Sequence, residues 1–179
     1  MEIYRNGDFE VENKEDNSPL TVADKKANEI INRFLLPHGI PIISEENKQI
    51  DYQERKSWSQ CWIVDPLDGT KEFIKRNDEF TVNIALVQNG KPALGVIFAP
   101  ALNTLYFAMV SESKAFRYRM SSEFSDIDKI LGNAEEIGPA TKTDRLKVVG
   151  SRSHMNEDTK SFIENLKETY GDDIEIVSK

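Results

Sequence analysis

The sequence predicts a layered fold of the α+β or α/β class, in which an antiparallel meander sheet is flanked by helices. Two observations lead to this prediction. Apolar runs at 80–87 and 93–98 enclose Asn89-Gly90, which is a strong hairpin signal, and another apolar run follows at 105–110. Apolar residues between 23 and 35 recur at helical spacing, which predicts an amphipathic helix ahead of the sheet.

A second domain is predicted because the order of elements changes after the meander. A strand at 146–149, a helix capped by Asn156 and a strand at 173–177 follow one another. We therefore place the domains at 1–143 and 144–179, the second being only the beginning of an α/β domain.

The sequence defines the secondary structure less clearly between these two parts. A strand is expected at 114–120, whereas 121–138 is polar and fits a helix or a loop equally. In the second part we expect Phe162, Ile163 and Leu166, or the strand 174–177, to be partly exposed, disordered or covered by a neighbouring molecule, because so short a unit buries little apolar surface.

Composition narrows the class of protein. The 179 residues are 39% hydrophobic and 30% charged, no apolar run approaches the ~20 residues of a membrane span, and 1–16 is unlike a signal peptide. We expect a cytoplasmic protein, with the periphery of the inner membrane as an alternative location. The net charge of −8 argues against a nucleic-acid partner, and the single Cys61, expected in the core, permits no disulfide within the chain. The sequence does not indicate an oligomeric state.

The predicted helix begins at Thr21 and ends before Pro37 and Gly39. Met1–Tyr4 fits the tail of another helix, and 6–18 a hairpin or loop. Asp24, three residues after Thr21, allows two interpretations. Spacing alone favours an acid that caps the helix, and the alternative is an acid that orients a hydroxyl or water in a functional site.

Two short apolar runs each lead into acids. The run 41–43 precedes Ser44-Glu45-Glu46, and the run 62–64, expected as a buried strand, precedes Asp65. Two strands that end in acids could share one site, although Glu45 could equally open a solvated loop over 47–59.

The segment that follows Asp65 suits a metal site. Pro66 stiffens a predicted turn that holds Asp68 towards Asp65, and Gly69 permits a positive φ. The Gly69 and Thr70 amides would then face an anion. Paired carboxylates suit Mg²⁺ and phosphate chemistry, which favours a phosphatase, and the plainer alternative is a turn with solvated acids.

The motifs together resemble the inositol monophosphatase superfamily of Mg²⁺-dependent, lithium-sensitive phosphatases, which implies a sugar-phosphatase-like layered fold. The resemblance rests on Thr21-Val-Ala-Asp24, Ser44-Glu45-Glu46 and Asp65-Pro-Leu-Asp-Gly-Thr70. Asp-Gly-Thr-Lys-Glu-Phe73, with Ser18-Pro-Leu-Thr21 and Gly-Ser-Arg-Ser-His154, is most similar to the 3'(2'),5'-bisphosphate nucleotidase branch. That branch implies removal of the 3'-phosphate from 3'-phosphoadenosine 5'-phosphate in sulfur assimilation or nucleotide recycling.

The resemblance also implies roles for particular residues. Two or three Mg²⁺ ions would be held by Glu45, Asp65, the Leu67 carbonyl and Asp68, and through them these acids would bind the substrate. Thr70, oriented by Asp24, would position the attacking water. The Gly69 and Thr70 amides would bind phosphate, and Ser151 and His154 would contact the nucleotide.

Three other functions share some of these features. Inositol monophosphatase activity would use the same metal ligands, so only the substrate pocket separates it. A haloacid-dehalogenase phosphatase is disfavoured because its acids stand two residues apart, and those here stand three apart. A non-catalytic fragment or binding module is the third alternative, because the chain has neither the later metal-ligand motif of the family nor most of the helix expected before Glu2. We therefore expect the 179 residues alone to have little activity.

Overall fold

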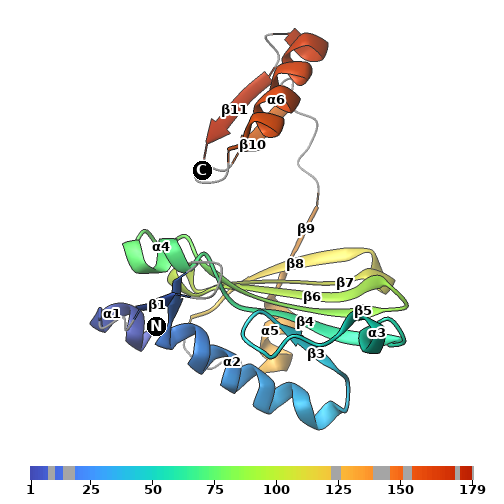
Figure 1. Ribbon diagram of the computed structural model, residues 1–179. Helices are drawn as coiled ribbons and strands as arrows, with labels where there is room; N and C mark the ends of the chain where they lie inside the picture. The colour runs from blue at the N-terminus through green and yellow to red at the C-terminus, as the bar shows by residue number, and fades with distance from the viewer. Residues whose placement is uncertain are drawn as a thin grey trace. The chain divides into compact units, whose positions relative to one another are not determined.

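The computed structural model describes residues 1–7, 11–13, 19–121, 126–138, 146–150, 155–171 and 174–178. These residues belong to two compact units, Met1–Gly138 and Pro139–Lys179 (Figure 1). The domain division at 143/144 stays a prediction for the protein that carries this chain.

Within the described residues of the first unit, seven strands form one sheet. In spatial order these are β3 (Ile42–Ser44), β4 (Gln60–Asp68), β5 (Thr81–Gln88), β6 (Lys91–Ala99), β7 (Thr104–Met109), β8 (Lys114–Arg119) and β9 (Glu135–Ile137). β3 is parallel to β4, and every other neighbouring pair is antiparallel. The predicted meander and the predicted strand after it are confirmed.

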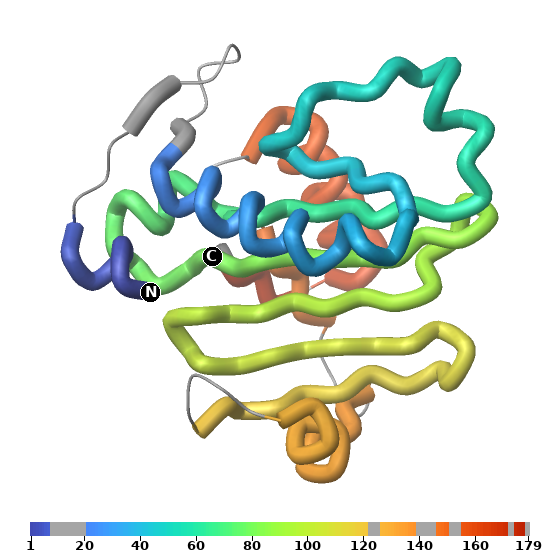
Figure 2. The backbone as a smooth tube through the Cα atoms, turned by 90° about the horizontal axis from the view of Figure 1, so that it is seen from below, coloured from blue at the N-terminus to red at the C-terminus, as the bar shows by residue number. Residues whose placement is uncertain are grey.

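Helices and a small ribbon accompany this sheet. The helices are α1 (Glu2–Asn6), α2 (Val22–Leu35), α3 (Tyr52–Arg55), α4 (Thr70–Lys75) and α5 (Ile127–Asn133), with 3-10 turns at Leu36–His38, Pro100–Leu102 and Val110–Glu112. β1 (Val11–Asn13) pairs with β2 (Pro19–Thr21) in an antiparallel ribbon. α2 lies across β3 and β4, and α5 lies near the opposite edge of the sheet (Figure 2).

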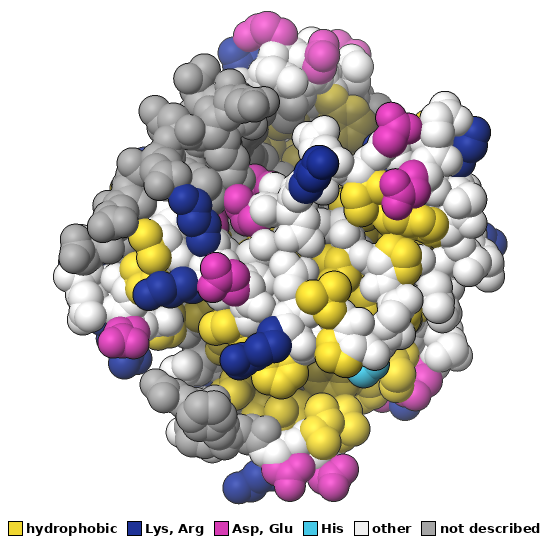
Figure 3. Space-filling model, turned by 60° about the horizontal axis from the view of Figure 1, so that its bottom comes forward, with side chains coloured by type: hydrophobic (Ala, Val, Ile, Leu, Met, Phe, Trp, Pro, Cys, Tyr) yellow, Lys and Arg dark blue, Asp and Glu magenta, His cyan; other side chains and the backbone are white. Residues whose placement is uncertain are grey.

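α2 forms where the sequence predicts it. Thr21 is the N-cap and, with Asp24, makes a capping box that satisfies backbone amides of the first turn. The inner side of the helix covers Ile42, Ser44 and Val64, which are all buried. Hydrophobic side chains also gather at the molecular surface on the side of the sheet that α2 covers (Figure 3).

An aromatic cluster packs α1 and α4 against the sheet. Tyr4, Phe73 and Phe80 have ring centroids 4.8 to 5.0 Å apart and enclose Leu67. Burial of such a side chain stabilises a fold by about 1.5–3 kcal/mol. Tyr4 donates its hydroxyl hydrogen to Asp78 Oδ1 over 2.7 Å, and burial, then this hydrogen bond, raises the pKa of Tyr4. The cluster therefore holds α4 against the end of β4.

Several local expectations were wrong. The run 62–64 is a strand, but only Val64 is fully buried, and Ile63 is 46% exposed because it lies on the face opposite α2. Cys61 is half-buried instead of a core residue, and burial raises the pKa of its thiol. The polar connection 47–59 contains α3, which Asp51 caps by accepting from the Gln53 amide over 2.7 Å.

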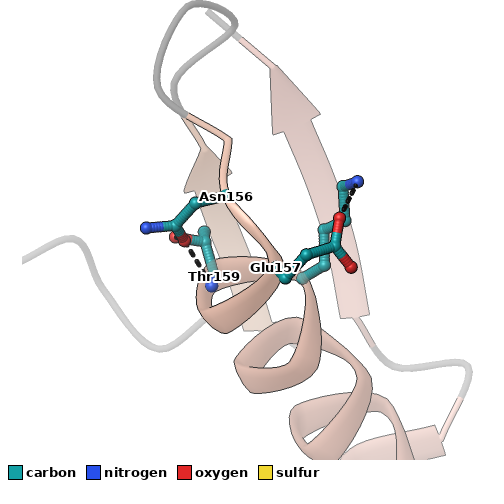
Figure 4. Close-up of polar contacts among 4 residues, drawn as sticks. Asn156, Glu157 and Thr159 are labelled. Carbon is teal, nitrogen blue, oxygen red and sulfur yellow. Dashed lines mark hydrogen bonds and ion pairs between the residues drawn. The ribbon is translucent and has the colours of Figure 1, made fainter.

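The second unit is a parallel pair of strands with one helix. β10 (Leu146–Gly150) pairs with β11 (Ile174–Ser178), and α6 (Glu157–Tyr170) connects them. As predicted, Asn156 caps α6, its Oδ1 accepting from the Thr159 amide over 2.8 Å, while Glu157 pairs with Lys160 (Figure 4).

The expected partial exposure is confirmed at Phe162, at Leu166 and in β11, where Ile176 is 40% exposed, and is wrong at Ile163. Phe162 is 61% exposed, but Ile163 is buried, because α6 packs against β10 and β11. None of the described helices is both long and apolar enough to cross a membrane.

Candidate active site

The end of β4 is a bulged strand, which corrects the predicted turn. Asp65 pairs with Asn83 and Asp68 with Thr81, so two residues of β4, Pro66 and Leu67, stand opposite one residue of β5. A proline is tolerated at such a bulge because the ladder hydrogen bond is already interrupted there. The bulge places the two acids at its two ends.

Gly69 turns the chain from β4 into α4, a helix that the sequence did not predict. Its φ is +91°, and a Cβ at this position would stand 2.8 Å from the Glu79 carbonyl oxygen. Only glycine fits both the left-handed backbone and this close approach. The turn carries Thr70 directly to the first position of α4.

Thr70 and Asp24 meet although 46 positions separate them in the sequence. The Thr70 hydroxyl lies 3.2 Å from Asp24 Oδ1 and 3.2 Å from the Leu67 carbonyl oxygen, so it can donate to either. Asp24 is 1% exposed, and its Oδ2 accepts from the Thr21 amide at 2.8 Å and the Thr21 hydroxyl at 2.5 Å. The capping interpretation of Asp24 is therefore confirmed, and its other oxygen accepts from the Thr70 hydroxyl, while a functional role for this contact stays a prediction.

The two acids of the bulge are held by different partners. Asp65 Oδ1 accepts from the Leu67 amide over 3.2 Å, and Asp68 Oδ2 accepts from Asn83 Nδ2 over 3.0 Å. Asn83 thus stands opposite Asp65 in the ladder and bonds to Asp68. Asn83 is therefore related to both acids, to Asp65 by strand pairing and to Asp68 by a side-chain hydrogen bond.

Glu45 lies beside Asp65 because β3 and β4 are parallel. Ser44 pairs with Val64, so the next residue of each strand is an acid, and the Glu45 amide donates to the Val64 carbonyl over 3.3 Å. β3 ends at Ser44 while β4 continues to Asp68, and the carboxyl end of a parallel strand is a usual place for ligands. This register places the two acids at neighbouring positions, and a site that they share stays a prediction.

A row of polar residues on α2 anchors the segment around Glu45. Asn28 accepts from the Ser44 hydroxyl over 2.7 Å and donates to Asn47 Oδ1 over 2.9 Å, and Asn32 also donates to Asn47 Oδ1 over 2.9 Å. Sequence reasoning missed Asn28 and Asn32. The available signal was that Asn28 and Asn32 follow Asp24 at four and eight residues, because residues four apart share one face of a helix.

The oxygen donors fit a hard cation, although they are not gathered as a complete site. Among the described residues, no three acidic, histidine or cysteine side chains come close enough to hold a metal ion together. Asn83 Oδ1, however, is buried and has no hydrogen-bond partner among the described residues. A buried oxygen without a donor, on a side chain that bonds to the Asp68 carboxylate, suits Mg²⁺ or a bound water. Glu45, Asp65, Leu67 and Asp68 as metal ligands stay a prediction.

Asn83 is the other residue that sequence reasoning missed. It interrupts the apolar run 80–87, and an amide within a strand of that kind was the signal. Two predicted substrate contacts, Ser151 and His154, lie outside the described residues.

A family model described as the inositol monophosphatase family matches residues 1–174. The chain therefore belongs to the inositol monophosphatase family, and its mixed α/β fold is the one expected for that family.

Similar proteins include bisphosphate nucleotidases. The 3'(2'),5'-bisphosphate nucleotidase CysQ of Escherichia coli strain K12 is 43% identical over 163 residues, covering 89% of this chain and 60% of that protein. The crystal structure of CysQ from Bacteroides thetaiotaomicron is 44% identical with a TM-score of 0.79, over 93% of this chain and 62% of that one.

A staphylococcal inositol monophosphatase, at 22% identity and a TM-score of 0.66 over 93% of this chain and 56% of that one, shows the fold alone. The chain spans about three fifths of the length of the curated relatives.

Proposed function

We propose that the protein carrying this chain is a Mg²⁺-dependent phosphoric monoester hydrolase that removes the 3'-phosphate from 3'-phosphoadenosine 5'-phosphate. The hydrogen bond between Thr70 and Asp24 at the end of β4, beside Asp65, carries this proposal. Identity of 43% to a bisphosphate nucleotidase, against 22% to an inositol monophosphatase, supports the nucleotide as substrate.

In the proposed reaction, Thr70 and Asp24 orient the attacking water. The Thr70 hydroxyl has one hydrogen, and when it donates to Asp24 its oxygen can only accept from the water. That arrangement points a water lone pair away from Thr70 and towards the phosphorus. Because Asp24 is buried and held by Thr21, the pair is oriented before the substrate binds.

The acids and amides around this pair bind the reacting phosphate. Glu45, Asp65, the Leu67 carbonyl and Asp68 would hold two or three Mg²⁺ ions. When bound, Mg²⁺ lowers the pKa of a coordinated water and stabilises charge on the phosphoryl oxygens. The Gly69 and Thr70 amides at the start of α4 would donate to the phosphate.

Ser151 and His154 would contact the nucleotide in the same proposal. We place the activity in the cytoplasm. Peripheral attachment to the inner membrane is the alternative location.

Substitution of Asp68 with asparagine tests the proposal. Removing one carboxylate should lower Mg²⁺-dependent kcat/KM for 3'-phosphoadenosine 5'-phosphate at least about 100-fold, because even an outer partner of a metal ligand is worth about 10- to 100-fold. Release of inorganic phosphate measures this, and Li⁺ should inhibit the unmodified protein.

The matched control is Asp128→Asn, which removes the same charge from an exposed position on α5 and should leave activity unchanged. Full Mg²⁺-dependent activity in Asp68→Asn would contradict the proposed ligand set. A preference of the unmodified protein for inositol 1-phosphate would instead identify an inositol monophosphatase.

A further inference from the structure

Asn83 is a polar residue in the middle of a strand that is otherwise mostly apolar. It lies in β5, and asparagine is among the residues that β-strands disfavour. Its Nδ2 donates to Asp68 Oδ2 over 3.0 Å, but its Oδ1 is buried and meets no donor among the described residues. A buried carbonyl oxygen without a donor lowers stability, because it has lost its hydrogen bonds to water. The fold alone therefore does not account for this amide.

The same side chain is close to both acids of the bulge. Asn83 pairs with Asp65 in the antiparallel ladder. Residues that face each other in such a ladder point to the same side of the sheet, with Cβ atoms about 4.5–5.5 Å apart. At the other end of the bulge, Asp68 accepts the hydrogen bond from Asn83 Nδ2. One amide is therefore opposite one proposed metal ligand and bonded to the other.

The hydrogen bond to Asp68 sets the orientation of that carboxylate. Asp68 is an exposed residue, so without a partner its side chain would sample several rotamers. A ligand that is ordered before the metal binds loses less conformational entropy on binding. Residues that orient a metal ligand in this way typically contribute about 10- to 100-fold to metal affinity.

The unpaired oxygen of Asn83 suits the hydration of Mg²⁺. This ion dehydrates reluctantly and usually keeps several waters when one or two carboxylates hold it. A water that is bound to a cation through its oxygen has both hydrogens available to donate. Asn83 Oδ1 is an acceptor for one of them, since no described donor occupies it.

We propose that Asn83 is a positioning residue of the metal site. Its Nδ2 orients the Asp68 carboxylate, and its Oδ1 accepts a hydrogen from a water that Mg²⁺ retains. The inference rests on the Mg²⁺-dependent part of the proposed function, and it adds an amide outside the proposed set of metal ligands. β5 then carries a residue that lowers the stability of the metal-free protein and strengthens the binding of Mg²⁺.

Asn83→Leu separates the fold from the metal site, because leucine has nearly the shape of asparagine without its polar atoms. In the metal-free form of the protein that carries this chain, the urea midpoint should stay constant or rise, since an unpaired buried oxygen is removed. Calorimetric titration with Mg²⁺ alone should give a dissociation constant about 10- to 100-fold above that of the unmodified protein. Phosphate release should fall at limiting Mg²⁺ and recover as Mg²⁺ is raised, because the carboxylates remain.

Gln88→Leu is the matched control for the metal titration. Gln88 is also in β5, and its Nε2 donates to Gln60 Oε1 of β4 over 3.3 Å, at the end of the strand pair that is remote from Asp68. The substitution removes an amide bond between the same two strands and should leave the Mg²⁺ dissociation constant unchanged.

Asn28→Leu is the control for the stability measurement. The Asn28 oxygen accepts from the Ser44 hydroxyl over 2.7 Å, so this amide oxygen, unlike that of Asn83, has a partner in the fold. Its loss leaves a buried donor unpaired and should lower the urea midpoint of the metal-free protein.

An unchanged Mg²⁺ dissociation constant in Asn83→Leu would overturn the positioning role. A lower urea midpoint of the metal-free variant would overturn it as well, because the amide would then serve the fold. Either result would leave the proposed nucleotidase activity standing. An unmodified protein that binds no Mg²⁺ would overturn the proposed function and this inference together.

Discussion

Thr70→Val should lower kcat for 3'-phosphoadenosine 5'-phosphate by about 10²- to 10³-fold, the loss that follows removal of one preorganised hydrogen-bonding group, and should change KM little. Valine has nearly the shape of threonine, so the packing at the start of α4 is kept. It cannot donate to Asp24 Oδ1, which lies 3.2 Å from the hydroxyl in the native protein, and it cannot accept from a water. Steady-state release of phosphate at saturating Mg²⁺ measures the change.

Thr70→Ser is the control for this substitution, because it keeps the hydroxyl. We expect Thr70→Ser to retain at least roughly a tenth of the native kcat, since only a methyl group is removed and the hydrogen-bonding capacity remains. Native turnover by Thr70→Val would show that the attacking water is oriented by another group.

Gly69→Ala should destabilise the first unit by roughly 2–5 kcal/mol. Left-handed backbone costs an alanine about 1–2 kcal/mol, and forcing its Cβ towards the Glu79 carbonyl oxygen, 2.8 Å away, should add about 1–3 kcal/mol. Urea unfolding followed by circular dichroism measures the free energy of unfolding. Turnover should fall as well, because Gly69 places Thr70 against Asp24.

Gly90→Ala is the control that separates the cost of the close Cβ contact from the cost of the left-handed backbone. Gly90, in the hairpin between β5 and β6, also has a positive φ, +73°. Apart from its chain neighbours, however, no described residue has an atom within 4 Å of the position that a Cβ would take there. The substitution should therefore cost only the backbone term of about 1–2 kcal/mol. Equal destabilisation by the two alanines would show that the Glu79 carbonyl moves away from the new Cβ with no loss of stability.

The elements that the sequence predicted well are those determined by interactions between near neighbours in the chain. Thr21 with Asp24 caps the start of α2, and Asn156 caps the start of α6, because their side chains accept hydrogen bonds from nearby backbone amides. Asn89-Gly90 forms the turn between β5 and β6 because these residues tolerate a positive φ. The sequence also indicated that the acids after two short strands, Glu45 and Asp65, could share one site, which stays a prediction.

What sequence did not predict depends on contacts between distant residues. The bulge at Pro66 exists because β5 holds Asp65 and Asp68 in register on either side of it. In the sequence, Asn28 and Asn83 are only polar residues within apolar segments. Their partners become visible in the fold, where Asn28 bonds to Ser44 of β3 and Asn83 bonds to Asp68 of β4. Likewise, a pocket lined by Lys48 and Arg55 forms only when the segment 45–59 returns beside β4.

A double-mutant cycle on Asp24→Asn and Thr70→Val tests most directly whether the buried acid acts through the hydroxyl. If the two residues form one unit, each substitution alone should remove most of the benefit, and kcat of the double variant should lie within about threefold of the slower single variant. Losses in kcat that multiply in the double variant would contradict this, because they would show that Asp24 and Thr70 contribute to the reaction independently.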